Sequence, residues 1–200
     1  MSVELALARI AELQSAFARP AAPQATTAAS FATALNGTMA AAPAQASGLG
    51  ATAGTSAGQA VLNAVRNEVG VTEQPPGSND APRIAQYRQA TVGSGVGPWC
   101  AYFTSWAARE AGVPLGDAGQ GFGRVDDVWA WAERSGKAIP AAGAQPQPGD
   151  LIVWDEHIGV VESVGADGTV NTIEGNSSDS VARRSYGADG GGAIGYVRLG

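Results

Sequence analysis

The sequence predicts an α+β fold in which helices come first and an antiparallel sheet follows. Two observations lead to this prediction. Between residues 56 and 134, apolar residues recur at spacings of three and four, as in amphipathic helices. From about residue 150, short runs rich in Val and Ile alternate with PGD, GADG and GN, which is typical of strands joined by tight turns. Helices and strands in separate blocks favour the α+β class.

The helical block divides into four elements. We expect helices over about residues 56–70, 81–93, 100–112 and 125–134. Gly70 and Gly112 end two of them, because glycine readily adopts the left-handed conformation at a helix C-terminus. Asp80 can cap the second helix, and Pro82 is acceptable in its first turn.

The sheet block contains five candidate strands, and we expect a sheet of about five or six strands. The candidates cover residues 150–154, 157–164, 169–174, 180–186 and 194–199. Their short connections predict an antiparallel meander.

Two segments precede this predicted domain of residues 57–200. Residues 1–19 are expected to form a short amphipathic helix, because apolar residues recur at spacings of three and four. A lone helix of this length is marginal in water, so it either docks on a partner or is a fraying tail. Residues 20–56 carry no charged side chain and are rich in Ala, Thr, Ser, Gly and Pro, which predicts a disordered linker.

Charge and cysteine content exclude several classes. A net charge of −6 argues against nucleic-acid binding, which needs clustered Lys and Arg. One cysteine excludes an intramolecular disulfide, and one cysteine with one histidine is too few for an ordinary zinc site. The uncharged run after Arg19 is too weakly apolar to span a membrane. The first residues lack the basic start of a cleavable secretory signal.

Four residues form a candidate catalytic group. Cys100 begins a predicted helix, where the helix dipole and free backbone amides favour a thiolate. His157 could act as its base and acid. Glu174 and Asn176 lie two residues apart at a strand end, so both would project to one face and could orient the imidazole. Taken singly, each of the four is more often structural than catalytic.

The motifs PWCAYFTSW, PGDLIVW, HIGVVE and TIEGN, in this order, resemble the CHAP family of cysteine amidohydrolases and peptidases. This family belongs to the papain-like and NlpC/P60 group, which cuts peptidoglycan. The resemblance covers about residues 57–200. It implies that Cys100 is the nucleophile, His157 the general base and acid, Glu174 the group that orients the imidazole, and Asn176 a supporting polar residue.

Other contacts with substrate are less defined by the resemblance. The backbone amide of Cys100 would hold the oxyanion together with a second donor, for which Tyr87 is a guess. Trp99 and Trp154 flank the candidate residues, either as packing residues or as walls of the substrate cleft. Some relatives bind calcium through acidic residues shortly before the nucleophile, but QATVGSGVGPW has no carboxylate, so we expect neither metal nor cofactor.

The resemblance leads to an expected function and location. We expect a monomeric peptidoglycan hydrolase that forms an acyl-enzyme, either an N-acetylmuramoyl-L-alanine amidase or a peptide endopeptidase. The alternative is a wall-binding or scaffolding component that does not cut. The site of action would be the cell wall, the periplasm or the outside of the cell. The leading segments resemble those of wall hydrolases exported through the flagellar apparatus, with the first helix docking on an export partner; phage release explains them equally well.

Overall fold

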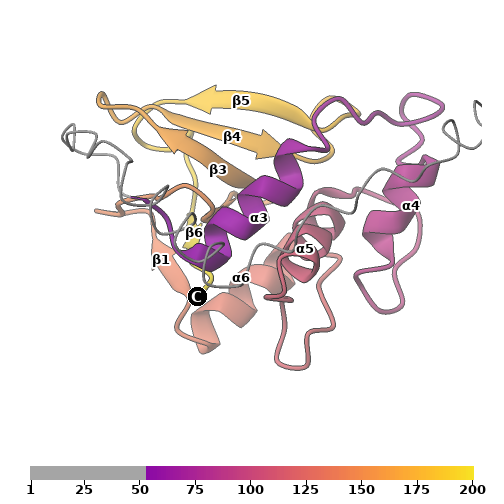
Figure 1. The fold of residues 1–200 in the computed structure, drawn as a ribbon, viewed down its shortest axis with the longest axis horizontal. Coiled ribbons are helices and arrows are strands. Elements are labelled where there is room, and N and C mark those ends of the chain that lie inside the picture. Colours follow the sequence, from indigo (N-terminus) through magenta and orange to yellow (C-terminus); the bar gives the residue numbers. More distant parts are fainter. Residues whose placement is uncertain (1–52) are drawn as a thin grey trace, which may run out of the picture. The chain divides into compact units, whose positions relative to one another are not determined.

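The computed structural model describes residues 53–200, which form an α+β domain (Figure 1). The predicted helix of residues 1–19 and the predicted linker up to residue 52 lie outside the described residues. Helices come first in the chain and a six-stranded antiparallel sheet follows. The predicted fold class is therefore confirmed.

The four helices of the described residues match the four that the periodicity predicts. They are α3 (Ser56–Arg66), α4 (Pro82–Arg88), α5 (Cys100–Glu110) and α6 (Val125–Arg134). One expectation about their ends is wrong: Asp80 does not cap α4, whose N-cap position belongs to Ala81. The Asp80 carboxylate instead forms an ion pair with Arg88, at 2.6 Å.

The six strands all pair in antiparallel fashion, in the order β1-β6-β2-β3-β4-β5. They are β1 (Ala138–Pro140), β2 (Leu151–Val153), β3 (Ile158–Val164), β4 (Val170–Glu174), β5 (Ala182–Tyr186) and β6 (Gly195–Val197). The five predicted strands are present. β1 escapes prediction because three residues ending in Pro140 are too few to show an alternating pattern, and proline suits such an edge strand.

Helix α5 is the centre of the domain. Every residue from Cys100 to Ala108 is buried, so this helix has no solvent face along most of its length. It contacts α3, α4, α6 and strand β3. Its aromatic residues join a cluster in which the ring centroid of Tyr87 lies 5.1 Å from that of Phe103 and 5.0 Å from that of Trp106. The start of α5 is therefore held firmly against the rest of the core.

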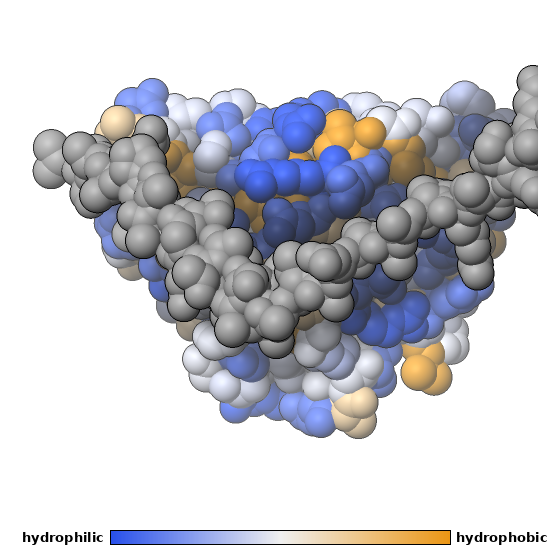
Figure 2. Space-filling view, in the orientation of Figure 1, coloured by the Kyte–Doolittle hydropathy of each residue, from blue (hydrophilic) through white to orange (hydrophobic). Residues whose placement is uncertain are grey.

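The first and last segments of the domain are tied together. The Thr55 hydroxyl accepts a hydrogen bond from the Gly58 amide, at 2.9 Å, and donates one to the Leu199 carbonyl, at 2.5 Å. Thr55, just before the expected boundary at residue 57, thus contacts both ends of the domain. The visible protein surface is mostly hydrophilic, with separate hydrophobic spots (Figure 2). Within residues 53–200, no helix has the length and apolar character needed to cross a membrane.

Candidate active site

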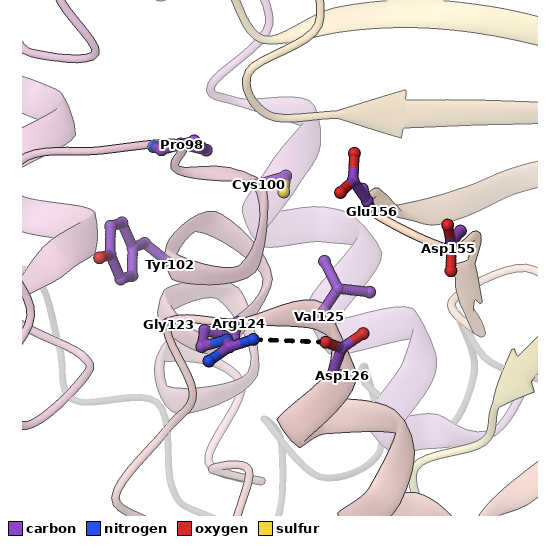
Figure 3. Close-up of a pocket in the computed structure, with 9 residues that line it drawn as sticks. All are labelled: Pro98, Cys100, Tyr102, Gly123, Arg124, Val125, Asp126, Asp155 and Glu156. Carbon is purple, nitrogen blue, oxygen red and sulfur yellow. Dashed lines mark ion pairs between the residues drawn. The ribbon is translucent and has the colours of Figure 1, made fainter.

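Cys100 is the first residue of α5 and lines a cleft of about 460 Å³ (Figure 3). Its side chain is only 5% exposed. In Figure 3 its sulfur faces the space between α5, the start of α6 and the segment that carries Asp155 and Glu156. The cleft is lined by Pro98, Cys100, Tyr102, Gly123, Arg124, Val125, Asp126, Asp155 and Glu156.

The residue before the cysteine is anchored in the core. Trp99 is 0% exposed, and its indole Nε1 donates to Glu73 Oε1 at 2.8 Å. The same carboxylate accepts from the backbone N–H of Asn79 at 2.7 Å. These contacts determine where α5 begins. The first backbone N–H groups of a helix lack intrahelical partners and carry partial positive charge, so Cys100 lies where an anion is stabilised.

His157 lies in the turn between β2 and β3, with its backbone carbonyl bonded to the Trp154 amide at 2.8 Å. Its Nε2 forms a hydrogen bond with Glu174 Oε2 at 2.9 Å. Because Nε2 is engaged in this way, Nδ1 is the nitrogen left for Cys100. The indole of Trp154 stacks on the imidazole, with ring centroids 5.5 Å apart. The ring is therefore held at one edge and on one face.

Glu174 ends β4 and is 1% exposed. Its Oε1 accepts from Thr172 Oγ1 at 2.5 Å and from the Tyr186 hydroxyl at 2.9 Å, which leaves Oε2 for the imidazole. Gly159 makes room for this carboxylate, because a Cβ atom at residue 159 would lie 2.6 Å from Glu174 Cγ. This contact explains the glycine in HIGVVE.

Gly175, the residue after Glu174, has a similar steric role where the chain passes α5. A Cβ atom at this position would lie 2.7 Å from Phe103 Cβ of α5. The strand end that carries Glu174 thus passes directly against the helix that begins with Cys100. The glycine in TIEGN allows this close approach.

The electrostatics favour a charged imidazole. Burial acts to lower the pKa of His157, but the hydrogen bonds and charges of Cys100 and Glu174 outweigh it and raise the pKa to about 9. Burial acts to raise the pKa of Glu174, but hydrogen bonds from His157, Thr172 and Tyr186 outweigh burial and hold it below its ordinary value. Near neutral pH the site therefore favours an imidazolium beside the Glu174 carboxylate.

Three of the four candidate catalytic residues meet at this site: Cys100, His157 and Glu174. Asn176 follows β4 in a turn, with a left-handed backbone φ of 57°. Because the strand ends at Glu174, the alternation that would bring Asn176 to the same face does not continue. Among residues 53–200, no side-chain hydrogen bond joins Asn176 to the other three.

Tyr87 and Trp99 do not have the substrate-binding positions that the sequence suggested. Tyr87 is 0% exposed, and its hydroxyl donates to Glu68 Oε2 at 2.6 Å. A side chain that is enclosed and already paired cannot reach an oxyanion in the cleft. The indole of Trp99 is equally buried and is bonded to Glu73, so Trp99 is a packing residue of the core. Of the three suggested residues, only Trp154 is partly exposed and beside the imidazole.

Sequence reasoning missed Thr172 and Tyr186, the two donors to Glu174 Oε1. Thr172 carried a usable signal, because a residue two positions before Glu174 on a strand lies on the same face. Tyr186 carried none, since its contact depends on how β5 pairs with β4. The α6 side of the cleft, with Arg124 and Asp126, was also missed, because its place beside Cys100 depends on tertiary packing that no local pattern records.

Within residues 53–200, no group of three or more His, Cys, Asp or Glu side chains is placed to hold a metal ion. The acidic side chains of the cleft, Asp126, Asp155 and Glu156, do not form such a group.

Known proteins and protein families show similarity to part of this chain. Residues 91–176 match the model of the CHAP domain family. Two solved structures are similar: the peptidoglycan hydrolase RipB from Mycobacterium tuberculosis, with 19% identity, and the resuscitation promoting factor interacting protein RipA, with 17% identity. Both have a TM-score of 0.42; the alignments cover 71% and 72% of this chain, and 64% and 62% of theirs. The chain thus spans less than two thirds of either structure. No curated protein matches.

Proposed function

We propose that this domain hydrolyses an amide bond of peptidoglycan with Cys100 as nucleophile. The observation that carries the proposal is the 2.9 Å hydrogen bond between His157 and Glu174, which orients an imidazole that also interacts with the Cys100 side chain. The CHAP family supports the choice of peptidoglycan as substrate. A cysteine at a helix N-terminus beside an imidazolium is well placed to act as a nucleophile.

Acylation proceeds by attack of the Cys100 thiolate on the carbonyl carbon of the amide. A carbon–sulfur bond forms and the carbonyl oxygen becomes an oxyanion. When the carbon–nitrogen bond breaks, the leaving amine takes a proton from the His157 imidazolium. A thioester and a neutral imidazole remain, and Glu174 keeps the ring in place throughout.

Deacylation uses water. The neutral His157 takes a proton from the attacking water, the carbon–sulfur bond breaks, and the product leaves as a carboxylic acid. The thiolate and imidazolium are restored. The Cys100 backbone N–H, which has no intrahelical partner because it is in the first turn of α5, is one donor to the oxyanion. Tyr87 is excluded as the second by its burial and its bond to Glu68.

The finer assignment lies between an N-acetylmuramoyl-L-alanine amidase and a peptide endopeptidase acting in the wall, in flagellar assembly or in phage lysis. The two activities leave different new ends. An amidase frees the lactyl carboxyl of muramic acid and the amino group of the stem peptide, whereas an endopeptidase frees ends within the peptide. Mass spectrometry of the released fragments separates them.

Digestion of purified peptidoglycan by the full chain tests the proposal. We expect soluble fragments from the wild type and none above background from Cys100→Ala. Glu133→Gln is a matched control, because it changes an exposed carboxylate on α6 that does not line the cleft. Equal release by wild type and Cys100→Ala would refute the proposal.

Thiol labelling addresses the alternative of a domain that binds the wall without cutting. The chain has a single cysteine, so iodoacetamide reports on Cys100 alone. A cysteine activated by His157 reacts well below about pH 8, because the thiolate is the reactive form. Slow labelling that rises only at higher pH, like that of an ordinary thiol, would favour the non-catalytic alternative.

A further inference from the structure

Tyr186 touches both groups that hold the imidazole. It lies on β5, the edge strand of the sheet, beside β4. Its hydroxyl donates to Glu174 Oε1 at 2.9 Å. Its ring lies 5.1 Å from the ring of Trp154, which in turn stacks on His157. Like the imidazole itself, Tyr186 therefore contacts both Glu174 and Trp154.

The loop after β5 holds this arrangement together. Trp154 Nε1 donates to the Gly190 carbonyl at 2.9 Å. The next residue, Gly191, has φ of 66°, and a Cβ atom there would lie 2.5 Å from Tyr186 Cδ1. The backbone of the loop is thus closely packed against the tyrosine ring while it bonds the tryptophan. Both supports of the imidazole are linked to one short segment of chain.

We propose that Tyr186 is a positioning residue for the Cys100–His157 pair, acting through Glu174 and Trp154. This inference deepens the proposed function and depends on it for its catalytic meaning. Two donors on Oε1, Thr172 and Tyr186, keep the carboxylate from turning about its last bond. Oε2 therefore stays directed at Nε2 of His157.

The charges around the tyrosine are consistent with a donor role. Burial and the Glu174 carboxylate raise the pKa of Tyr186 to about 12, with an opposing effect from Arg184. The hydroxyl therefore keeps its proton at the pH at which the enzyme would act. The titratable groups that face His157 are Cys100 and Glu174. Hydrogen bonds and charges of these two groups raise the pKa of His157.

The effect of the Tyr186 hydroxyl on the pKa of His157 depends on whether the hydroxyl positions the Glu174 carboxylate or only disperses its charge. If the hydroxyl positions the carboxylate, its removal lets the carboxylate turn, weakens the bond to the imidazolium and lowers the pKa of His157. If it only disperses charge, its removal makes the carboxylate more basic and raises the pKa of His157. The sign of the change separates the two roles.

The test compares Tyr186→Phe with Tyr196→Phe in the full chain. Both variants remove one hydroxyl from a tyrosine of the same sheet, but Tyr196 makes no hydrogen bond to Glu174. The chain has one histidine, so nuclear magnetic resonance titration reports on His157 alone. We expect the midpoint of Tyr186→Phe to fall below the wild-type value, with kcat/KM on peptidoglycan reduced about tenfold and KM little changed. Tyr196→Phe should behave like wild type.

Thr172 provides an independent second comparison, should Tyr186→Phe be poorly folded. Thr172→Val removes the other donor to Oε1, whereas Thr172→Ser keeps a hydroxyl there. We expect the His157 midpoint to fall in the valine variant and to be restored in the serine variant. Thermal unfolding of all four variants shows that each is folded.

An unchanged or raised midpoint in folded Tyr186→Phe would overturn the inference. The titration needs no substrate, so it is separate from the proposed function. If Cys100→Ala abolishes wall cleavage but Tyr186→Phe changes neither the midpoint nor kcat/KM, only the positioning role fails. If the wild type leaves peptidoglycan intact but the midpoint still falls, the positioning of His157 stands and the substrate assignment fails.

Discussion

Replacement of Glu174 by Gln tests how much the proposed site depends on a charged partner for the imidazole. The hydrogen bond between Glu174 and His157 joins two groups that are ionised near neutral pH, and Glu174 is 1% exposed, so solvent screens it little. A hydrogen bond to a charged group is worth about 1.5–3 kcal/mol. At about 1.4 kcal/mol per factor of ten, its full loss would lower kcat/KM about 10- to 100-fold.

The glutamine should keep the fold while removing the charge. Its amide can accept from His157 at one end and donate to the Thr172 and Tyr186 hydroxyls at the other, since hydroxyls accept as well as donate. We therefore expect kcat/KM on purified peptidoglycan to fall about 10- to 100-fold with little change in KM. The pKa of His157 should fall from about 9, because one of its two stabilising partners becomes neutral. The alkaline limb of the pH–rate profile should move to lower pH with it.

The matched control is Glu68→Gln, which changes another buried glutamate that bonds Arg83 and Tyr87 instead of the histidine. It should lower the thermal midpoint but leave the His157 titration in place. Wild-type kinetics and an unmoved titration in folded Glu174→Gln would refute the reasoning and assign the orientation of His157 to another group.

Three further predictions follow from the described contacts. Gly159→Ala should lower both kcat/KM and the unfolding midpoint, because its Cβ would lie 2.6 Å from Glu174 Cγ; wild-type activity would show that the carboxylate can shift freely. Tyr87→Phe should cost about 1–2 kcal/mol in denaturant unfolding, because Glu68 loses a buried donor, yet leave kcat/KM unchanged; a large loss of activity would return Tyr87 to the site. The pKa of His157 is raised from 6.5 to about 9, so its contribution to the free energy of unfolding is full below about pH 6.5 and is lost as the pH rises through about 9. His157→Gln should lack this loss in urea titrations across that range, and an equal loss in the variant would trace it to another group.

The amphipathic and alternating patterns were sufficient for the fold class and for four helices and five strands. These patterns are local, because one buried face of a helix or strand repeats every few residues. They failed where an element was very short, as for β1, or where a side chain had a stronger partner than the local one, as for Asp80 with Arg88. They also placed Asn176 on the face of Glu174, which the turn after β4 prevents.

The sequence indicated Cys100 as the nucleophile and His157 as its base, because each is the single residue of its type and lies in one of four ordered motifs. The glycines in HIGVVE and TIEGN were visible as motif residues, but their steric reasons were not, since these lie in contacts with Glu174 and Phe103. Only the tertiary structure decided which neighbours hold the catalytic group. Tyr186 reaches Glu174 and Trp154 because β5 pairs with β4, and Tyr87 is excluded because its hydroxyl is enclosed beside Glu68. Such contacts join residues far apart in the chain, and no local pattern records them.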